Sequence, residues 1–252
     1  MQPVYVRLRE RARQIVAGFP PPDFYRDHAQ AHTYSGQYLK KDPVLIKLRQ
    51  FVDDNLENDF GHGLQHAIKV TEDAGALMHI EGQAAGYSKL KLERRISIVQ
   101  CAGLLHDIKR KKKDHARLGA DLARKILKNY PLQQDEIDDV CRAIQNHEAF
   151  KEVIGIDTPE GMLVSDCLYD ADKFRWGPDN FTHTLWDMIS FYNPTLAKFM
   201  ARYPEGMAGL EKIKATFRTE TGKKYGPRFI DLGLAVGKKL HDVILSEFSE
   251  HL

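Results

Sequence analysis

An apolar stretch that ends in two metal-type ligands constrains the fold of this chain most. Residues 96–105 are mostly apolar, and His106 and Asp107 follow them directly. Such a stretch predicts a helix that is buried in the core. Burying an imidazole beside a carboxylate is costly unless both have a partner, so the pair favours an ion in the interior. The other interpretation is a polar helix terminus in which Asp107 accepts a hydrogen bond.

Two distant residues add ligands of the same kind. His66 lies beside an apolar stripe with helical spacing, and Asp172 ends a segment in which small or apolar residues separate the acids. Acids that sit close together beside apolar residues indicate a bound cation. Four nitrogen and oxygen ligands would then come from three separate segments.

The order, spacing and local context of these residues resemble the HD-domain superfamily of metal-dependent phosphohydrolases. The resemblance rests on His66, on residues 104–108 and on residues 170–173, and it covers roughly residues 58–180. It implies an all-α core that holds one or two divalent metals. It also implies hydrolysis of phosphoester or phosphoanhydride bonds. The metal ligands that it implies are His66, His106, Asp107 and Asp172.

Two further histidines, His115 and His147, resemble additional positions of binuclear HD proteins. In HD-GYP cyclic-dinucleotide phosphodiesterases and HD-type diiron oxygenases, such histidines hold a second metal. The gap from His106 to His115 is shorter here than in those relatives. Two interpretations therefore stay open: His115 and His147 bind a second metal, or they contact phosphate and support the ligands of a single ion.

Imidazole and carboxylate without thiolate suit Mn, Fe, Co, Ni, Zn or Mg rather than a structural zinc cage. Four protein ligands on an octahedral ion leave positions for a water and a phosphoryl oxygen. The basic run of residues 109–113 follows the ligand pair, and a cluster of cations there would attract a polyanionic substrate. The predicted phosphate contacts are Lys173, His62, Lys109 and Arg110. The predicted general base is Glu148 or Asp170.

The expected substrate is a nucleotide or another small phosphorylated compound, and Phe174 or Trp176 would stack on a base unless they pack in the core. Two alternatives remain. With six protein ligands, the chain would match an HD-type diiron oxygenase. A non-catalytic helical signalling module would keep the metal site for stability alone. A homo-oligomer is compatible with each of these.

Composition limits the partners and the compartment. The 252 residues, 42% of them hydrophobic, suffice for a sizeable core, and the formal charge of +2 argues against a nucleic-acid polymer as partner. The three cysteines lie in apolar helical patterns rather than at disulfide spacings, which fits a reducing compartment. The chain shows neither a long uninterrupted apolar stretch nor a secretory signal, so we expect a cytoplasmic protein without a membrane partner.

Strong helical patterns and few strand signals predict an all-α fold, an HD-domain helical bundle with N- and C-terminal helical extensions. We expect N-terminal helices and a connector over 1–57, the metal-binding core over 58–180 and C-terminal helices over 181–252. Residues 18–42 are predicted to be irregular, and residues 221–227 to form a turn. Pro194 should kink or split one helix, and Asp114 should cap another. The predicted helices are 4–17, 43–57, 63–81, 91–106, 115–129, 134–147, 160–171, 181–202 and 228–249.

Overall fold

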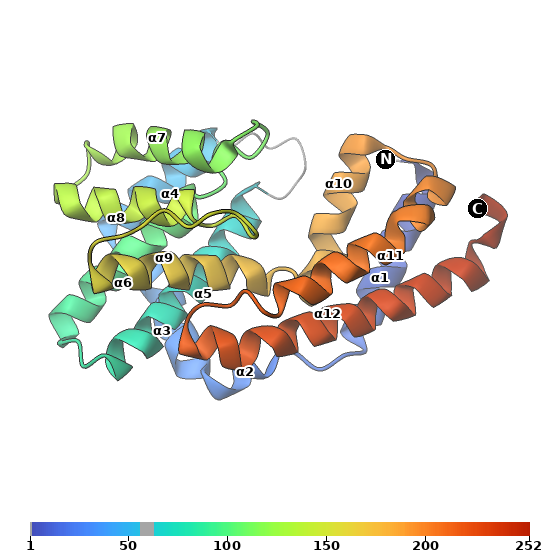
Figure 1. Ribbon diagram of the computed structural model, residues 1–252, viewed down its shortest axis with the longest axis horizontal. Coiled ribbons are helices and arrows are strands. Elements are labelled where there is room, and N and C mark those ends of the chain that lie inside the picture. The colour runs from blue at the N-terminus through green and yellow to red at the C-terminus, as the bar shows by residue number, and fades with distance from the viewer. Residues whose placement is uncertain (1, 56–62) are drawn as a thin grey trace.

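The computed structural model describes residues 2–55 and 63–252, which form an all-α fold without strands (Figure 1). No helix among these residues has the length and apolarity needed to cross a bilayer. The helices are α1 (Pro3–Ala17), α2 (Asp23–Asp27), α3 (Ala29–Lys41), α4 (Pro43–Asn55), α5 (Gly63–Ala84), α6 (Lys89–Leu105), α7 (His115–Leu127), α8 (Gln134–Gln145), α9 (Pro159–Phe174), α10 (Leu185–Tyr192), α11 (Leu196–Ile213) and α12 (Glu220–Glu247). A π-helical turn, η1 (Asn180–Thr184), precedes α10, and a 3-10 turn, η2 (Ser249–His251), follows α12.

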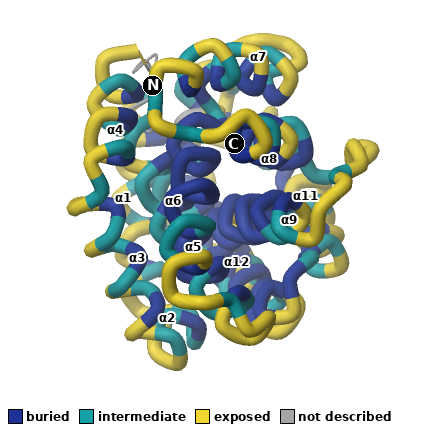
Figure 2. The backbone as a smooth tube through the Cα atoms, turned by 90° about the vertical axis from the view of Figure 1, so that its left-hand side faces the viewer, coloured by how far each residue is buried: buried dark blue, intermediate teal, exposed yellow. Residues whose placement is uncertain are grey.

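Three helices form the centre of the core. Helix α5 packs against α6 and α9, and α8 covers another side of α9 (Figure 2). Every residue of α6 from Ile96 to Leu105 is buried, so the predicted buried helix is confirmed. Two polar side chains of this stretch have internal contacts: Gln100 Nε2 donates to the carbonyl oxygen of Ser35 at 3.0 Å, and Ser97 Oγ lies 3.5 Å from Asp42 Oδ2. The end of α6 therefore delivers His106 and Asp107 into the interior.

The prediction of an irregular connector over residues 18–42 is wrong, because this segment contains α2 and α3. Three residues of α3 that are four positions apart, Ala31, Ser35 and Leu39, are buried and face the core. The small side chain of Ser35 lets α3 approach α5 closely, because a Cβ on Gly75 would lie 2.3 Å from Ser35 Oγ. The three prolines that precede α2 led to the prediction of an irregular segment, although the residues after them have a helical pattern.

The last helix begins earlier than predicted, at Glu220, so the expected turn over residues 221–227 is also wrong. Thr219 caps α12 by accepting a hydrogen bond from the Gly222 amide at 2.8 Å, and Pro227 lies inside the helix. Its glycines mark close contacts instead of a turn. A Cβ on Gly226 would lie 2.4 Å from the Phe217 ring.

Two predicted local features have mixed outcomes. The split at Pro194 is confirmed, because α10 ends at Tyr192 and α11 begins at Leu196. Helix α7 begins at His115 as predicted, but Asp114 has a left-handed backbone (φ 58°) and makes no side-chain capping bond. The predicted cap is therefore wrong. The left-handed residue instead turns the chain sharply after the basic run.

Helices from both ends of the described chain pack together beside the core. Helix α12 contacts α5 and α9 along one part and α1 and α11 along another. Arg11 of α1 donates to Glu247 of α12 at 2.8 Å, and Tyr5 packs edge-on against Phe199 of α11. The three-part division at residues 57 and 180 stays a prediction.

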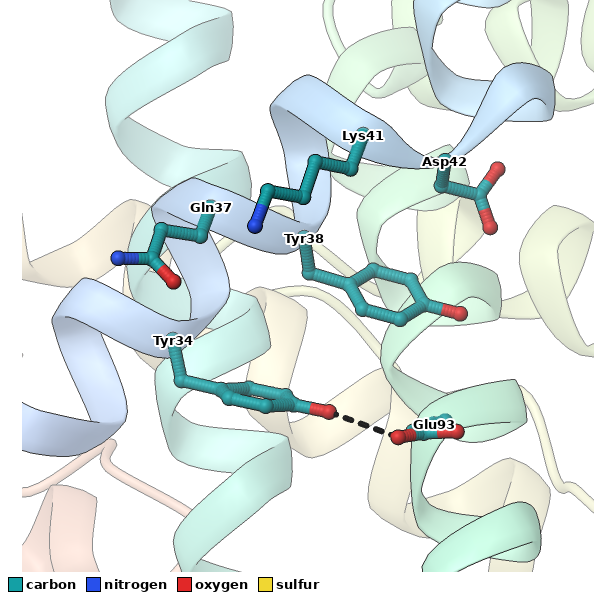
Figure 3. Close-up of a pocket in the computed structure, with 6 residues that line it drawn as sticks. All are labelled: Tyr34, Gln37, Tyr38, Lys41, Asp42 and Glu93. Carbon is teal, nitrogen blue, oxygen red and sulfur yellow. Dashed lines mark hydrogen bonds between the residues drawn. The ribbon is translucent and has the colours of Figure 1, made fainter.

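A hollow of about 340 Å³ lies between α3 and α6 (Figure 3). Tyr34 of α3 donates to Glu93 of α6 at 3.1 Å across it. None of the predicted site residues that the structure describes lines this hollow.

Close packing of α5 on α6 yields a stability prediction. A Cβ on Gly103 would lie 2.6 Å from Thr71 Oγ1 and 2.8 Å from Thr71 Cα. We expect Gly103→Ala to push the helices apart and to lower the free energy of unfolding by about 1–3 kcal/mol, as measured by urea denaturation.

The matched control is Gly206→Ala in α11, where no atom lies within 4 Å of the new Cβ. That change should stabilise the protein by up to about 1 kcal/mol. Equal effects of the two substitutions would contradict the packing argument.

Candidate metal centre

Six of the predicted site residues come from helix ends that meet at one end of the core. His66 lies in the first turn of α5, His115 opens α7, and Asp172 lies in the last turn of α9. His106 and Asp107 follow α6, and His147 follows α8. These helix ends lie on the side of the core that faces α10 in Figure 1.

Four of these side chains form a first group. His66 Nε2 lies 3.3 Å from His106 Nε2 and 3.3 Å from Asp172 Oδ1. Asp107 Oδ2 lies 3.7 Å from His66 Nε2 and 3.6 Å from His106 Nε2. His66, His106 and Asp107 thus bring two nitrogens and one oxygen within 4.8 Å of one another, and Asp172 adds a carboxylate oxygen beside the two imidazoles.

A second group shares Asp107 with the first. The other carboxylate oxygen, Asp107 Oδ1, lies 3.8 Å from His115 Nε2 and 3.6 Å from His147 Nε2. The two imidazole nitrogens lie 3.2 Å apart. Asp107 therefore directs one oxygen to each group, which is the arrangement of a carboxylate that bridges two ions. The shorter spacing before His115 does not prevent this arrangement.

Backbone carbonyls orient two of the imidazoles. His106 Nδ1 lies 2.8 Å from the carbonyl oxygen of Gly103, and His147 Nδ1 lies 2.6 Å from that of Ile144. A carbonyl can only accept, so Nδ1 carries the proton and Nε2 of the neutral ring presents a lone pair to the group. Lone pairs about 3.3 Å apart, as between His66 and His106, repel unless a proton or cation lies between them. The donor set fits divalent cations that prefer nitrogen and oxygen.

Burial and charge keep His106, His115, Asp107 and Asp172 in states that can bind a cation. For His147, burial lowers the pKa, but the hydrogen bond and the charge of Asp107 outweigh it and raise the pKa. Burial lowers the pKa of His106 to about 4, so its ring is neutral at pH 7. Burial also lowers the pKa of His115. For Asp107 burial raises the pKa, but His106, His147 and Arg110 outweigh it and hold the pKa well below the ordinary value. The pKa of Asp172 is likewise lowered, because Lys173 and His66 outweigh burial.

Lys173 lies inside the protein. Its Nζ donates to Asp172 Oδ2 at 2.5 Å and to the carbonyl oxygen of His147 at 2.9 Å, and the residue is buried. The ammonium thus neutralises Asp172 and ties the end of α9 to the segment after α8. The role of Lys173 as a substrate phosphate contact stays a prediction.

The two predicted general bases differ in position. Asp170 is buried, and its carboxylate accepts hydrogen bonds from the amides of Arg218 and Thr219, both at 2.8 Å. Its oxygens are therefore engaged at the start of α12 rather than with the two groups. Burial raises the pKa of Asp170 to about 6. Glu148 is half-buried, follows His147 directly and acts electrostatically on His115, so it is the better placed of the two.

The predicted cationic contacts lie in different surroundings. Arg110 is partly exposed, and its Nη1 lies 3.3 Å from Asp107 Oδ2 at the edge of the site. Lys109 is half-buried in the same run. His62 lies outside the described residues. Of the predicted phosphate contacts that the structure describes, Arg110 lies beside Asp107 and Lys173 beside Asp172, and Arg110 is the more exposed of the two.

Asn146 was not predicted, although it positions the segment after His147. Its Nδ2 donates to the carbonyl oxygen of Ile154 at 2.9 Å, and its Oδ1 accepts from the Ile154 amide at 2.8 Å. The side chain is buried, so both bonds are shielded from water. The sequence signal is weak, consisting only of an amide residue next to a candidate ligand.

A buried ionic network lies next to the two groups. Arg175, one turn after Asp172, donates to Asp73 of α5, to Asp179 and, at 2.5 Å, to Tyr25 of α2. Lys69, one turn after His66, donates to the same Asp179 at 3.2 Å. The network joins the ends of α5 and α9 that carry candidate ligands. Because Arg175 is buried and paired, it is not a free phosphate contact.

Of the two aromatic residues predicted to contact a base, Phe174 packs in the core. Its ring stacks on Phe229 with a centroid distance of 4.2 Å and an interplanar angle of 7°. Trp176 has an exposed fraction of 37%. Phe174 therefore packs in the core, as one of the two interpretations had it, whereas Trp176 is accessible to a ligand.

His32 makes stability depend on pH through this network. Its Nε2 lies 3.3 Å from Asp73 Oδ1, and that interaction raises the pKa of His32 against the opposing effect of burial. Because the pKa of His32 is higher in the folded protein than in the unfolded chain, protonated His32 stabilises the fold. This stabilisation is complete below about pH 6.5, the pKa expected for histidine in the unfolded chain. This stabilisation is lost as the pH rises through the folded pKa.

We therefore expect His32→Gln to destabilise the protein more at pH 6 than at pH 8, as measured by urea denaturation at both values. The exposed His251→Gln change serves as the control. A loss of stability that does not vary with pH would contradict the assigned interaction.

Comparison with known families gives one match. The model of the HD domain matches residues 63–175, a range that contains all six residues of the two groups. The search of curated proteins and the search of solved structures each give no significant match.

Proposed function

Residues 63–175 of the chain belong to the HD domain family, and on this basis we propose that it is a metal-dependent phosphohydrolase of a small phosphorylated compound. The observation that carries the proposal is the position of Asp107, whose two oxygens face two groups of histidines. A carboxylate shared in this way is suited to two divalent cations.

The ligand assignment follows from the two groups. We propose that His66, His106, Asp107 and Asp172 hold one ion and that Asp107, His115 and His147 hold a second. When bound, such ions polarise a phosphoryl oxygen and lower the pKa of a water molecule. Mn, Fe, Co, Ni, Zn and Mg all suit these donors to different degrees.

The other residues prepare the site for a phosphate group. Lys173 keeps Asp172 ionised, and the carbonyl oxygens of Gly103 and Ile144 hold two imidazoles in the binding orientation. Arg110 and Lys109 would offset the negative charge of the substrate at the edge of the site. Glu148, half-buried beside His147, is our candidate for accepting a proton from the attacking water.

The experiment is a reconstitution followed by a substrate screen. The purified chain is stripped with a chelator, loaded with Mn²⁺, Co²⁺ or Mg²⁺, and tested on nucleotides and small phosphoesters. We expect release of phosphate or pyrophosphate that depends on the metal and is lost again when the chelator returns. Hydrolysis that survives both chelation and Asp107→Ala would count against the proposal.

A diiron oxygenase is the second candidate, because four histidines and two aspartates also match the six ligands expected for that class. Metal analysis separates the two functions. Two irons per chain, oxygen uptake that depends on an organic substrate, and no phosphate release would favour the oxygenase. A fully loaded protein that converts nothing in either assay would favour the non-catalytic signalling module.

A further inference from the structure

A cavity of about 790 Å³ lies between η1, α10 and α11, and its lining belongs to residues 176–210, beyond the HD match. The volume falls within the usual range of small-molecule sites. Most of its lining is apolar, with Trp176, Phe181, Met188, Ile189, Phe199 and Leu210 among the contributors.

We propose that this cavity binds a long-chain fatty acid, with the hydrocarbon chain inside and the carboxylate at Lys198 and Arg202. The binding needs neither metal nor hydrolysis, so it is independent of the proposed phosphohydrolase activity.

The lining selects for hydrocarbon. Among the lining residues whose side chains the structure describes, Asn180 is the only uncharged amide, and the charged ones are Lys198, Arg202 and Glu205 of α11. A nucleotide or a sugar would leave most of its polar atoms without partners in such a cavity, which is costly. Aromatic and methionine side chains instead adapt to a flexible aliphatic chain.

Charges at the cavity favour an anionic head group. Lys198 and Arg202 lie one helical turn apart on α11, and both are exposed. The acid beside them, Glu205, lies 3.9 Å from Arg202, and both side chains are more than 80% exposed. A pair so long and so solvated is weak, so the cations remain available to a carboxylate.

Two glycines leave room for a ligand. Gly206 and Gly209 line the cavity inside α11, and a Cβ on either would meet no atom within 4 Å. Glycine costs an α-helix up to about 1 kcal/mol relative to alanine, and here no neighbouring atom requires it. A bound chain lying against this face of the helix would explain the absence of side chains.

Apolar surface beside the cavity is also left in water. Met188 and Tyr192 of α10 both line the cavity and have exposed fractions of 47% and 74%. An aliphatic chain lying against them would remove that surface from water.

The test uses hexadecanoate below its aggregation concentration and the metal-free full chain. Trp176 lines the cavity and Trp186 is buried, so fluorescence should change on binding in the wild type and not in Trp176→Phe. Isothermal titration calorimetry should show one saturable site in both proteins. Hexadecanol, which lacks the charge, should bind at least several-fold more weakly.

Two variants with matched controls locate the site. Gly206→Leu should fill the cavity and weaken binding by tenfold or more, whereas Ala235→Leu, at an exposed position of α12, should not change it. The pair Lys198→Glu and Arg202→Glu should weaken binding several-fold. The same charge change at the exposed Lys238 and Lys239 should have no effect.

Three outcomes would overturn the proposal. One is the absence of saturable binding by calorimetry. Another is binding that Gly206→Leu leaves unchanged, because the fatty acid would then lie elsewhere. The third is a ligand-free dimer, detected by light scattering, that Gly206→Leu converts to monomer, because a second copy of the chain would then occupy this face.

Discussion

Asp107→Asn should lose both bound metal and catalysis. Among the described side chains, its carboxylate is the one shared by both candidate groups, through Oδ2 to His66 and His106 and through Oδ1 to His115 and His147. An asparagine would keep one acceptor oxygen and direct an NH₂ group at imidazole nitrogens. We expect the metal content to fall from two ions per chain to one or none. We expect kcat/KM for the phosphorylated substrate to fall by roughly 10³-fold or more.

Elemental analysis and steady-state kinetics check this prediction together. The control is Asp121→Asn, an exposed aspartate of α7 that pairs with Arg117 at the surface. It should leave both quantities unchanged. If Asp107→Asn kept two ions and most of its activity, the shared-carboxylate arrangement would have no role in metal binding.

Arg175→Met should cause the largest loss of stability. Arg175 is buried and pairs with two acids, Asp73 and Asp179, of which Asp73 is itself buried. Removing the guanidinium would leave a carboxylate inside the protein without compensation. The free energy of unfolding should fall by about 3–5 kcal/mol, as measured by urea denaturation.

A second substitution shows whether the buried charge is the cause. Adding Asp73→Asn to Arg175→Met should recover part of the loss, because the uncompensated charge is removed. Arg202→Met, at an exposed position of α11, should change stability by no more than about 0.5 kcal/mol. A loss below about 1 kcal/mol for Arg175→Met would show that water reaches Asp73.

The helical fold and the cluster of candidate ligands could be anticipated from the sequence for different reasons. Helical periodicity is local, and it predicted most helices. The meeting of His66 with Asp172 is a long-range feature, and it was predicted from the order of the motif residues and not from periodicity. Asp107 directs one oxygen to each group because of the direction in which each helix end points. No residue pattern in the sequence encodes that direction.

The errors share a physical cause. A charged side chain next to a functional residue has the same sequence pattern whether it points inward or outward, so the burial of Lys173 and its pairing with Asp172 could not be predicted from the sequence. Glycine and proline were likewise interpreted as breaks in helices. At Gly226 the residue is small because the Phe217 ring lies against it, and the helix continues.

The position of α12 has a consequence for synthesis of the protein. This helix is about 42 Å long and contacts α1, the first helix of the chain, as well as α5 and α9 of the core. The buried face of α1, which includes Leu8, therefore has no complete partner until residues 220–247 have left the ribosome. At ordinary elongation rates this delay is on the order of tens of seconds. During that time the apolar face of α1 is exposed on the nascent chain, which makes it a natural point of contact for chaperones.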